Sequence, residues 1–233
     1  MMNDEWGNFR IFAPKYLSTK KLNMNNLEII FAEKLLKIKA IKLQPDNPFT
    51  WASGWKSPFY CDNRKTLSYV DLRSFVKIEL SRVILENFKD ADAIAGVATG
   101  AIPQGALVAD LLNLPFVYVR SKPKDHGLEN LIEGELKPGS KVVVVEDLIS
   151  TGGSSLKAVD AIRKNGCEVV GMVASYTYGF PVAKKAFEDA DVELITLTNY
   201  EAVLDVALKT GYITKDQIPM LNEWRKDPAH WEG

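Results

Sequence analysis

The sequence lacks a charge excess of either sign: 29 lysines and arginines stand against 30 aspartates and glutamates in 233 residues, a formal net charge of −1. Proteins that bind duplex nucleic acid usually carry a clear basic excess, so we expect no nucleic-acid partner. It also lacks any apolar run close to the about 20 residues that a membrane-spanning helix needs. The N-terminus lacks the charged, apolar and small-residue order of a secretory signal, and we expect no membrane partner.

Cysteine and histidine are both scarce, with 2 residues of each. Cys61 and Cys167 do not make a disulfide framework, which fits a reducing compartment, and we expect a cytoplasmic protein. No cluster of His, Cys and Asp has the spacing of a zinc site. The sequence therefore predicts no metal-binding residues. We interpret the two cysteines as ordinary buried residues and His230, in the tail beside Trp231, as surface.

The sequence does have a hydrophobic fraction of 46%, arranged in two alternating patterns that suit one α/β domain. Short runs that are apolar throughout suit strands buried on both faces, so we infer a central parallel sheet flanked by helices. The predicted strands are residues 93–98, 116–119, 142–145, 169–175 and 192–197. The predicted helices are residues 24–39, 70–88, 102–112, 154–165 and 181–189, with further helical character in 214–233.

Three segments fall outside this alternation. Residues 1–23 show no sustained period, and we interpret them as an N-terminal extension ahead of a single domain over residues 24–233. Residues 45–68 are rich in aromatics, serine, proline and glycine, which predicts short strands and turns. Residues 120–139 are too charged and glycine-rich to pack, and a loop of this length in a compact domain usually covers or binds a ligand.

Residues 142–155, VVVVEDLISTGGSS, are the most informative stretch. Four valines predict a buried strand, and Glu146 and Asp147 follow at its carboxyl end, where open parallel sheets bind their ligands. A hydroxyl- and glycine-rich turn then enters a helix whose free N–H groups can hold a phosphate. The adjacent carboxylates accept hydrogen bonds only, so they can hold two ribose hydroxyls. A buried strand before an N-capped helix would explain the turn but not the paired acids.

This stretch is neither a nucleotide P-loop nor a dinucleotide fingerprint, because no Gly-Lys-Ser/Thr follows and no GxGxxG opens the helix. It resembles the phosphoribosyl pyrophosphate (PRPP) motif of type I phosphoribosyltransferases, which has an apolar strand, two acids, two apolar residues and a hydroxyl- and glycine-rich loop. The resemblance implies a PRPP site formed by Glu146, Asp147, Leu148, Ile149, Ser150, Thr151, Gly152, Gly153 and Ser154.

YVRSKPKDHG, residues 118–127, resembles orotate phosphoribosyltransferases in particular. In that family this element is a strand end and a mobile catalytic loop, here residues 120–139, which reaches into the neighbouring subunit's active site. The resemblance implies a homodimer with the loop acting in trans, and it implies that Arg120, Lys124 and His126 bind pyrophosphate and are catalytic. Cations on a closing loop stabilise the departing pyrophosphate and exclude water. The alternative is a solvated charged loop.

FTWASGWKSPFYCDNRKTLS, residues 49–68, resembles the family's N-terminal hood, a name we use for residues 45–68. The resemblance implies that Lys56 and Arg64 face orotate's carboxylate and that Phe59 or Tyr60 stacks on its ring. Equally, these aromatics suit a core and these cations a surface. Ser150 is the third predicted orotate contact.

The chain also departs from the family pattern. GVATGAIPQGA, residues 96–106, matches a family loop close to the pyrophosphate, yet some members carry lysine where this chain has Gly100 and Ser121. Some carry an orotate-binding arginine at the position of Tyr178. Glu146 stands where others have aspartate, which keeps the charge.

The resemblance implies transfer of the phosphoribosyl group of PRPP to orotate, giving orotidine 5′-phosphate and diphosphate in UMP biosynthesis. Mg²⁺ would be bound mainly through oxygens of the substrate. Two alternatives stay open: a phosphoribosyltransferase for another base, such as a purine, or a non-catalytic regulator that binds PRPP and DNA. The regulator needs a basic DNA-binding segment, and the mixed-charge residues 1–23 are too short for a winged helix.

Overall fold

A six-stranded sheet forms the centre of the computed structural model, which describes residues 24–51, 54–122 and 131–232. The strand order is β10-β9-β8-β5-β6-β7, and all neighbours are parallel except β6 and β7. The four valines of β8 are fully buried, as expected for a strand covered on both faces. The strands are β5 (Ala93–Val97), β6 (Phe116–Val119), β7 (Ile132–Glu133), β8 (Lys141–Ile149), β9 (Glu168–Thr177) and β10 (Leu194–Asn199).

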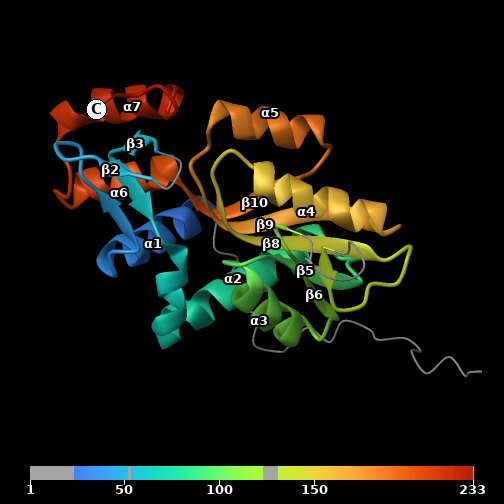
Figure 1. The fold of residues 1–233 in the computed structure, drawn as a ribbon. Helices are drawn as coiled ribbons and strands as arrows, with labels where there is room; N and C mark the ends of the chain where they lie inside the picture. Colours follow the sequence, from blue (N-terminus) through green and yellow to red (C-terminus); the bar gives the residue numbers. More distant parts are fainter. Residues whose placement is uncertain (1–23, 52–53, 123–130, 233) are drawn as a thin grey trace, which may run out of the picture.

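Helices cover both faces of this sheet (Figure 1), with α4 and α5 on one face and α2 and α3 on the other. α1 packs on α6 and β10 beside the sheet. The parallel sheet flanked by helices that the sequence predicts is therefore confirmed. The helices are α1 (Met24–Lys37), α2 (Val70–Asn87), α3 (Ile102–Leu112), α4 (Gly153–Lys164), α5 (Pro181–Asp189), α6 (Tyr200–Lys209) and α7 (Ile218–Lys226), with a short η3 (Lys215–Gln217) before α7. None of those described is long and apolar enough to cross a bilayer.

The hood forms short strands and one 3-10 helix, as its composition predicts. β2 (Phe49–Thr50) pairs with β3 (Lys56–Ser57), and β4 (Phe59–Cys61) pairs with β1 (Ile41–Leu43), both antiparallel. η2 (Asn63–Ser68) then leads into α2. In Figure 1 these strands lie beside α6 and α7, away from the β6 side of the sheet.

An aromatic cluster fastens the hood to the carboxyl end of β9. The Phe59 ring is fully buried, with its centroid 5.3–5.9 Å from those of Tyr178, Tyr200 and Tyr176. Trp224 of α7 stacks on the same ring at 6.2 Å. The prediction that Phe59 stacks on orotate is therefore wrong, because the inward face of β4 turns this ring into the core.

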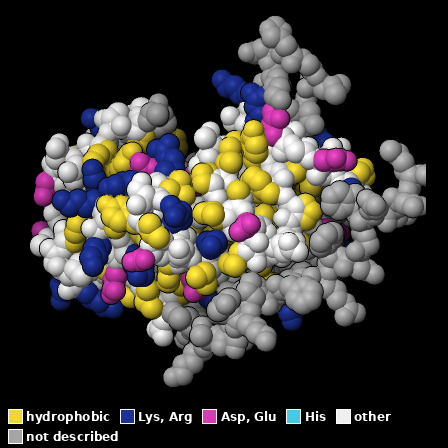
Figure 2. Space-filling model, turned by 90° about the horizontal axis from the view of Figure 1, so that it is seen from below, with side chains coloured by type: hydrophobic (Ala, Val, Ile, Leu, Met, Phe, Trp, Pro, Cys, Tyr) yellow, Lys and Arg dark blue, Asp and Glu magenta, His cyan; other side chains and the backbone are white. Residues whose placement is uncertain are grey.

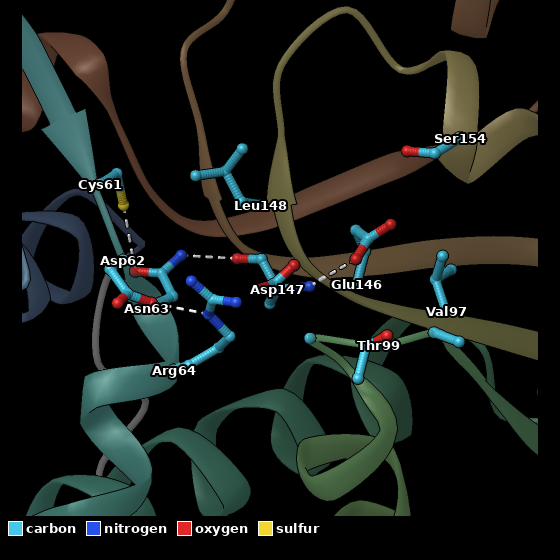
Figure 3. Close-up of a pocket in the computed structure, with 12 residues that line it drawn as sticks. Cys61, Asp62, Asn63, Arg64, Val97, Thr99, Glu146, Asp147, Leu148 and Ser154 are labelled. Atoms are coloured by element: carbon cyan, nitrogen blue, oxygen red, sulfur yellow. Dashed lines mark hydrogen bonds and ion pairs between the residues drawn. The ribbon is translucent and has the colours of Figure 1, made fainter. Parts of the chain in front are cut away.

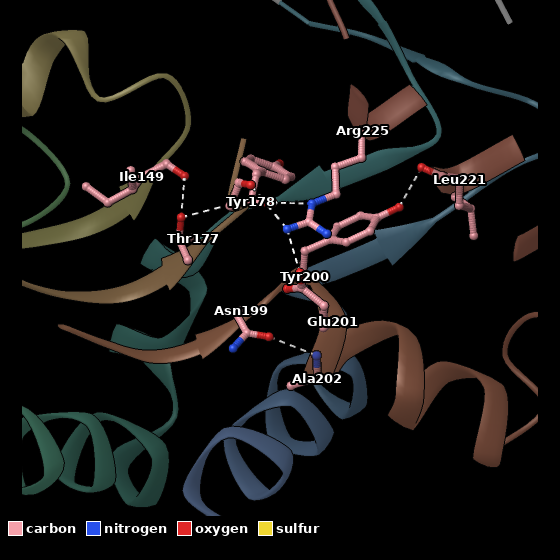
Figure 4. A network of polar contacts seen from close by, with 10 residues as sticks. Ile149, Thr177, Tyr178, Asn199, Tyr200, Glu201, Ala202, Leu221 and Arg225 are labelled. Atoms are coloured by element: carbon pink, nitrogen blue, oxygen red, sulfur yellow. Dashed lines mark hydrogen bonds and ion pairs between the residues drawn. The ribbon is translucent and has the colours of Figure 1, made fainter. Parts of the chain in front are cut away.

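α7 is held against the segment after β9 by Arg225, as Figure 4 shows. Its Nε and Nη2 donate to the carbonyls of Tyr178 and Gly179 at 3.0 and 3.1 Å, and Nη2 pairs with Glu201 at 2.6 Å. The Tyr178 N–H in turn donates to the Ile149 carbonyl at 3.1 Å. The C-terminal helix thus supports the end of β8, from which the predicted phosphate turn begins.

Two sequence predictions need correction in extent. β8 continues through both acids to Ile149, whereas the apolar run ends at Val145. The segment 120–139 is not wholly unpacked, because Ile132 and Leu136 are buried and β7 pairs with the open edge of β6. Two apolar side chains among many charges suffice to attach this segment. The predicted extension, residues 1–23, lies outside the described residues.

Candidate active site

Three segments from different parts of the chain meet around one cavity of about 250 Å³ (Figure 3). One wall is the hood from β4 into η2, the second is the loop after β5, and the third is the end of β8 with the start of α4. Because β5 and β8 are parallel neighbours, their carboxyl ends open at the same edge. The lining residues are Cys61, Asp62, Asn63, Arg64, Val97, Ala98, Thr99, Gly100, Glu146, Asp147, Leu148 and Ser154.

The paired acids lie at the centre of this arrangement. Glu146 is only 4% exposed; its Oε1 accepts from the Asp147 N–H at 2.9 Å and its Oε2 from Ser155 Oγ at 2.8 Å. Burial, and then the charge of Asp147, raise the pKa of Glu146 well above its usual range. Burial also raises the pKa of Asp147, although Glu146 and the cation of Arg64 oppose the rise. Two carboxyls crowded in a buried place favour a ligand that brings hydroxyl donors or positive charge.

Asn63 ties the hood to the strand that carries the acids. Its Nδ2 donates to the Asp147 carbonyl at 2.6 Å across 84 positions of sequence. Its Oδ1 accepts from Cys61 Sγ at 3.4 Å, and its carbonyl accepts from Thr66 Oγ1 at 2.7 Å. The position of the hood wall therefore depends directly on the end of β8.

The turn between β8 and α4 has the geometry of a phosphate site. Gly152 is the N-cap of α4 with φ +82°, a left-handed conformation that glycine adopts without strain. A Cβ at this position would lie 2.8 Å from Cε2 of Phe187, so α5 also restricts it to glycine. The first N–H groups of a helix have no partner within the helix and point at such a turn.

Of the residues that the motif predicts to bind PRPP, some line the cavity and others do not. Glu146, Asp147, Leu148 and Ser154 line the cavity. Ile149 is fully buried and does not line the cavity. Ser150, Thr151, Gly152 and Gly153 form the turn and lie outside the lining.

Arg120 lines a neighbouring cavity of about 290 Å³ with Lys157 and Lys164, and this cavity shares Ser154 with the first. Its Nη1 lies 3.4 Å from Glu133 Oε1. The structure thus brings Arg120 beside the acids' cavity but not into it. Lys124 and His126 lie outside the described residues.

The predicted orotate contacts are only partly brought together. Arg64 lines the cavity with a side chain that is 63% exposed, and its Nε pairs with Asp62 at 2.8 Å. Lys56 is exposed on β3 and does not line the cavity. Tyr60 points outward from β4 and packs 5.5 Å from the Phe49 ring. Tyr178, at the position of the missing arginine, is a core residue of the aromatic cluster.

Sequence reasoning missed several lining residues. It interpreted Cys61 as an ordinary buried residue, and it passed over Asp62 and Asn63. Burial and the charges of Asp147 and Asp62 raise the pKa of the Cys61 thiol, which disfavours the thiolate that a nucleophile needs. Gly100 has a direct reason to be glycine here, since a Cβ would collide with the Asp147 carboxylate. The signal in the sequence was the run CDNR, whose polar residues follow a short strand.

The chain is similar to known proteins over most of its length. Residues 75–210 match the family described as phosphoribosyl transferase domain. The orotate phosphoribosyltransferase of Bacteroides fragilis is 82% identical over 209 residues, which are 90% of this chain and 99% of that protein. The crystal structure of the Aeropyrum pernix orotate phosphoribosyltransferase has a TM-score of 0.69 at 30% identity, covering 79% of this chain and 99% of that one. The Mycobacterium tuberculosis orotate phosphoribosyltransferase in complex with PRPP has a TM-score of 0.59 at 25% identity, covering 78% and 99%.

The geometry of the site and the names of the similar proteins point to the same family. A parallel sheet presents two acids and a glycine-rich turn at one edge, beneath a hood, in a chain whose similar proteins are orotate phosphoribosyltransferases. The chain therefore belongs to the orotate phosphoribosyltransferases, within the phosphoribosyl transferase family.

Proposed function

We propose that the cavity between the hood and the ends of β5 and β8 is where the phosphoribosyl group passes from PRPP to orotate. The observation that carries this proposal is the pair Glu146 and Asp147, which line the cavity just before the helix N-terminus of α4. The reaction gives orotidine 5′-phosphate and diphosphate, a step of UMP biosynthesis that we place in the cytoplasm. The 82% identity to an orotate enzyme favours orotate over a purine base.

PRPP would lie along the edge of the sheet. The two carboxylates accept its ribose hydroxyls, and the N–H groups at the start of α4 receive its 5′-phosphate. Its pyrophosphate extends toward the loop after β5 and toward Arg120, with Lys124 and His126 as further predicted cations. The Mycobacterium tuberculosis relative was crystallised with PRPP, which supports the same ligand here.

Orotate would lie against the hood wall. Of its three predicted contacts, all within the described residues, Arg64 alone lines the cavity. A guanidinium binds a carboxylate with two parallel hydrogen bonds, so we assign orotate's carboxylate to Arg64. Lys56 and Ser150 stay predictions from the resemblance.

The chemistry needs charge control more than proton transfer. Breaking the C1–O bond leaves positive charge on the ribosyl group and negative charge on pyrophosphate. The carboxylates beside the ribose favour the first, and cations at the pyrophosphate favour the second. Because orotate is already anionic at neutral pH, positioning contributes more than a general base.

The donors at the cavity fit Mg²⁺, which prefers oxygen ligands and keeps several waters. Glu146 and Asp147 offer carboxylate oxygens and Thr99 a hydroxyl. Among the described residues, no three His, Cys, Asp or Glu side chains gather as metal ligands, so oxygens of PRPP and water would complete the shell. When bound, Mg²⁺ would neutralise charge on the pyrophosphate.

We propose further that the chain works as a homodimer, with residues 120–139 acting on the partner's site. In support, Tyr69, Val70 and Ile78 at α2 expose 44%, 63% and 40% of their surface. Figure 2, which views the molecule from below, shows hydrophobic side chains at the surface between charged ones. Exposed apolar side chains rimmed by charges suit contact with another subunit.

The direct test is loss of orotate absorbance with and without PRPP and Mg²⁺, in the wild type and Asp147→Asn. The asparagine NH₂ cannot accept a hydrogen bond from a ribose hydroxyl. We therefore expect kcat/KM to fall at least about 10²-fold. Asp205→Asn, on the exposed side of α6, is the matched control and should match the wild type. Turnover of a purine base in place of orotate would overturn the proposed substrate, and a fully active Asp147→Asn would overturn the proposed site.

A further inference from the structure

Ser155 lies directly behind the acid pair, outside the motif residues predicted to bind PRPP. It belongs to the first turn of α4, is 1% exposed, and does not line the cavity. Its Oγ donates to Glu146 Oε2 at 2.8 Å. With so little exposed surface its hydroxyl does not reach a substrate, so any effect of this hydroxyl on PRPP passes through Glu146.

Glu146 needs such a partner more than a shorter acid would. Glutamate has one more rotatable bond than aspartate, so its carboxylate has more orientations to lose on binding. The two hydrogen bonds, from the Asp147 N–H on one oxygen and Ser155 on the other, select one orientation. The two carboxylate oxygens have about four acceptor positions together, so positions remain for a ligand beside these two bonds and the contact with the Asp147 carboxyl. A bond to an ionised carboxylate is also stronger than one between neutral groups.

We propose that Ser155 is a positioning residue, which from α4 orients the buried Glu146 carboxylate so that its open acceptor positions meet the ribose hydroxyls of PRPP. The proposal rests on the proposed role of Glu146 as a ribose contact. It assigns the first turn of α4 two tasks: backbone N–H groups for the phosphate and a side-chain hydroxyl for the acid.

The test measures kcat and the KM for PRPP and for orotate in the full-length Ser155→Ala and Ser155→Cys variants. Losing a hydrogen bond to a charged group in a buried place corresponds to roughly a 10–100-fold loss of affinity. We expect the KM for PRPP to rise by about tenfold or more in Ser155→Ala, with kcat and the KM for orotate nearly unchanged. Ser155→Cys replaces the hydroxyl with a thiol that donates only weakly, so it should raise the same KM to a smaller extent.

Ser81→Ala is the matched control. Ser81 is a fully buried serine on α2 whose Oγ has no hydrogen-bond partner among the described residues. Its removal should leave both KM values at wild type. Comparable KM changes in Ser81→Ala and Ser155→Ala would mean that removing any buried serine hydroxyl raises the KM for PRPP. The proposal would then fail.

A double-mutant cycle with Glu146→Gln separates positioning from packing. If Ser155 acts through Glu146, Ser155→Ala should add nothing to the KM for PRPP in the Glu146→Gln background. Full additivity would overturn the proposal. A normal KM in Glu146→Gln alone would instead remove Glu146 from the ribose site and end the proposed function of that residue. A raised KM in Glu146→Gln with a normal KM in Ser155→Ala would overturn the inference about Ser155 alone.

Discussion

At the scale of single residues, the buried carboxylate of Glu146 lowers the stability of the fold, although the proposed function needs it. Burial and the neighbouring Asp147 raise the pKa of its carboxyl well above the usual range. A group whose pKa rises on folding binds its proton more tightly in the folded chain. Its contribution to stability is therefore present at low pH and is lost as the pH climbs from the unfolded value through the folded one. The ionised form that would accept ribose hydroxyls is held at a cost in unfolding free energy.

Glu146→Gln should therefore raise the Tm at neutral pH while weakening PRPP binding. Glutamine keeps the shape and can still accept from the Asp147 N–H, but it carries no charge to desolvate. The gain should shrink as the pH falls toward the unfolded glutamate value of about 4.3, because below that pH the wild-type carboxyl is protonated in both states. Thermal unfolding from pH 5 to 8 checks this, with the exposed Glu33→Gln on α1 as control. A Tm equal to or below wild type at pH 8 would count against it.

At the scale of elements, the sequence located the five long strands of the sheet and most of the helices, but it missed α6 and the short β7. It also gave no contacts for the hood. Residues 102–112 and 181–189 were predicted as helices and coincide with α3 and α5, because each shows a sustained helical period. The hood strands have two or three residues each, too few for alternation to say which side faces inward. The sequence therefore left Phe59 open between stacking on orotate and packing in the core, and the structure shows its ring in the core. The bond from Asn63 to Asp147 joins residues 84 positions apart and has no local signature.

The turn that joins β8 to α4 provides a prediction at this scale. Gly152→Ala should raise the KM for PRPP on the order of tenfold, because the added Cβ meets Phe187 and the turn must shift. The left-handed backbone should also cost about 1–2 kcal/mol of unfolding free energy. Enzyme kinetics and chemical denaturation measure the two effects separately.

Gly211 is the matched control for that turn. It has φ +69°, and a Cβ there would meet nothing within 4 Å. Gly211→Ala should therefore lower stability by a similar backbone contribution and leave the KM for PRPP unchanged. An unchanged KM in Gly152→Ala as well would separate the turn from phosphate binding.

At the scale of the whole molecule, the residues that the structure describes bring few cations to the proposed site. Arg120 lies at the neighbouring cavity and pairs with Glu133, and among the lining residues of the acids' cavity Arg64 is the one cation. Departing pyrophosphate needs more positive charge than this. A partner subunit that supplies Lys124 would complete the site, and a single sequence gives no pattern from which that assembly can be derived. Only the resemblance of residues 118–127 implies it.

Hybrid dimers test this assembly directly. Lys124→Ala and Asp147→Asn should each inactivate the homodimer, one by removing a loop cation and the other by removing a ribose contact. If the loop acts in trans, a hybrid of the two subunits has one site with both defects and one site with neither. Random mixing in equal amounts should then restore about a quarter of the wild-type sites, because half of the symmetric dimers become hybrids. If the loop acts in its own subunit, every site in the hybrid has one defect and activity stays at the level of the parents.

Differently tagged subunits, purified as hybrids and assayed by orotate loss, distinguish the two outcomes. Wild-type subunits with the same tags show whether subunit exchange itself lowers activity. Without recovery in verified hybrids, residues 120–139 would belong to their own subunit's site, and Lys124 of the same chain would supply the positive charge.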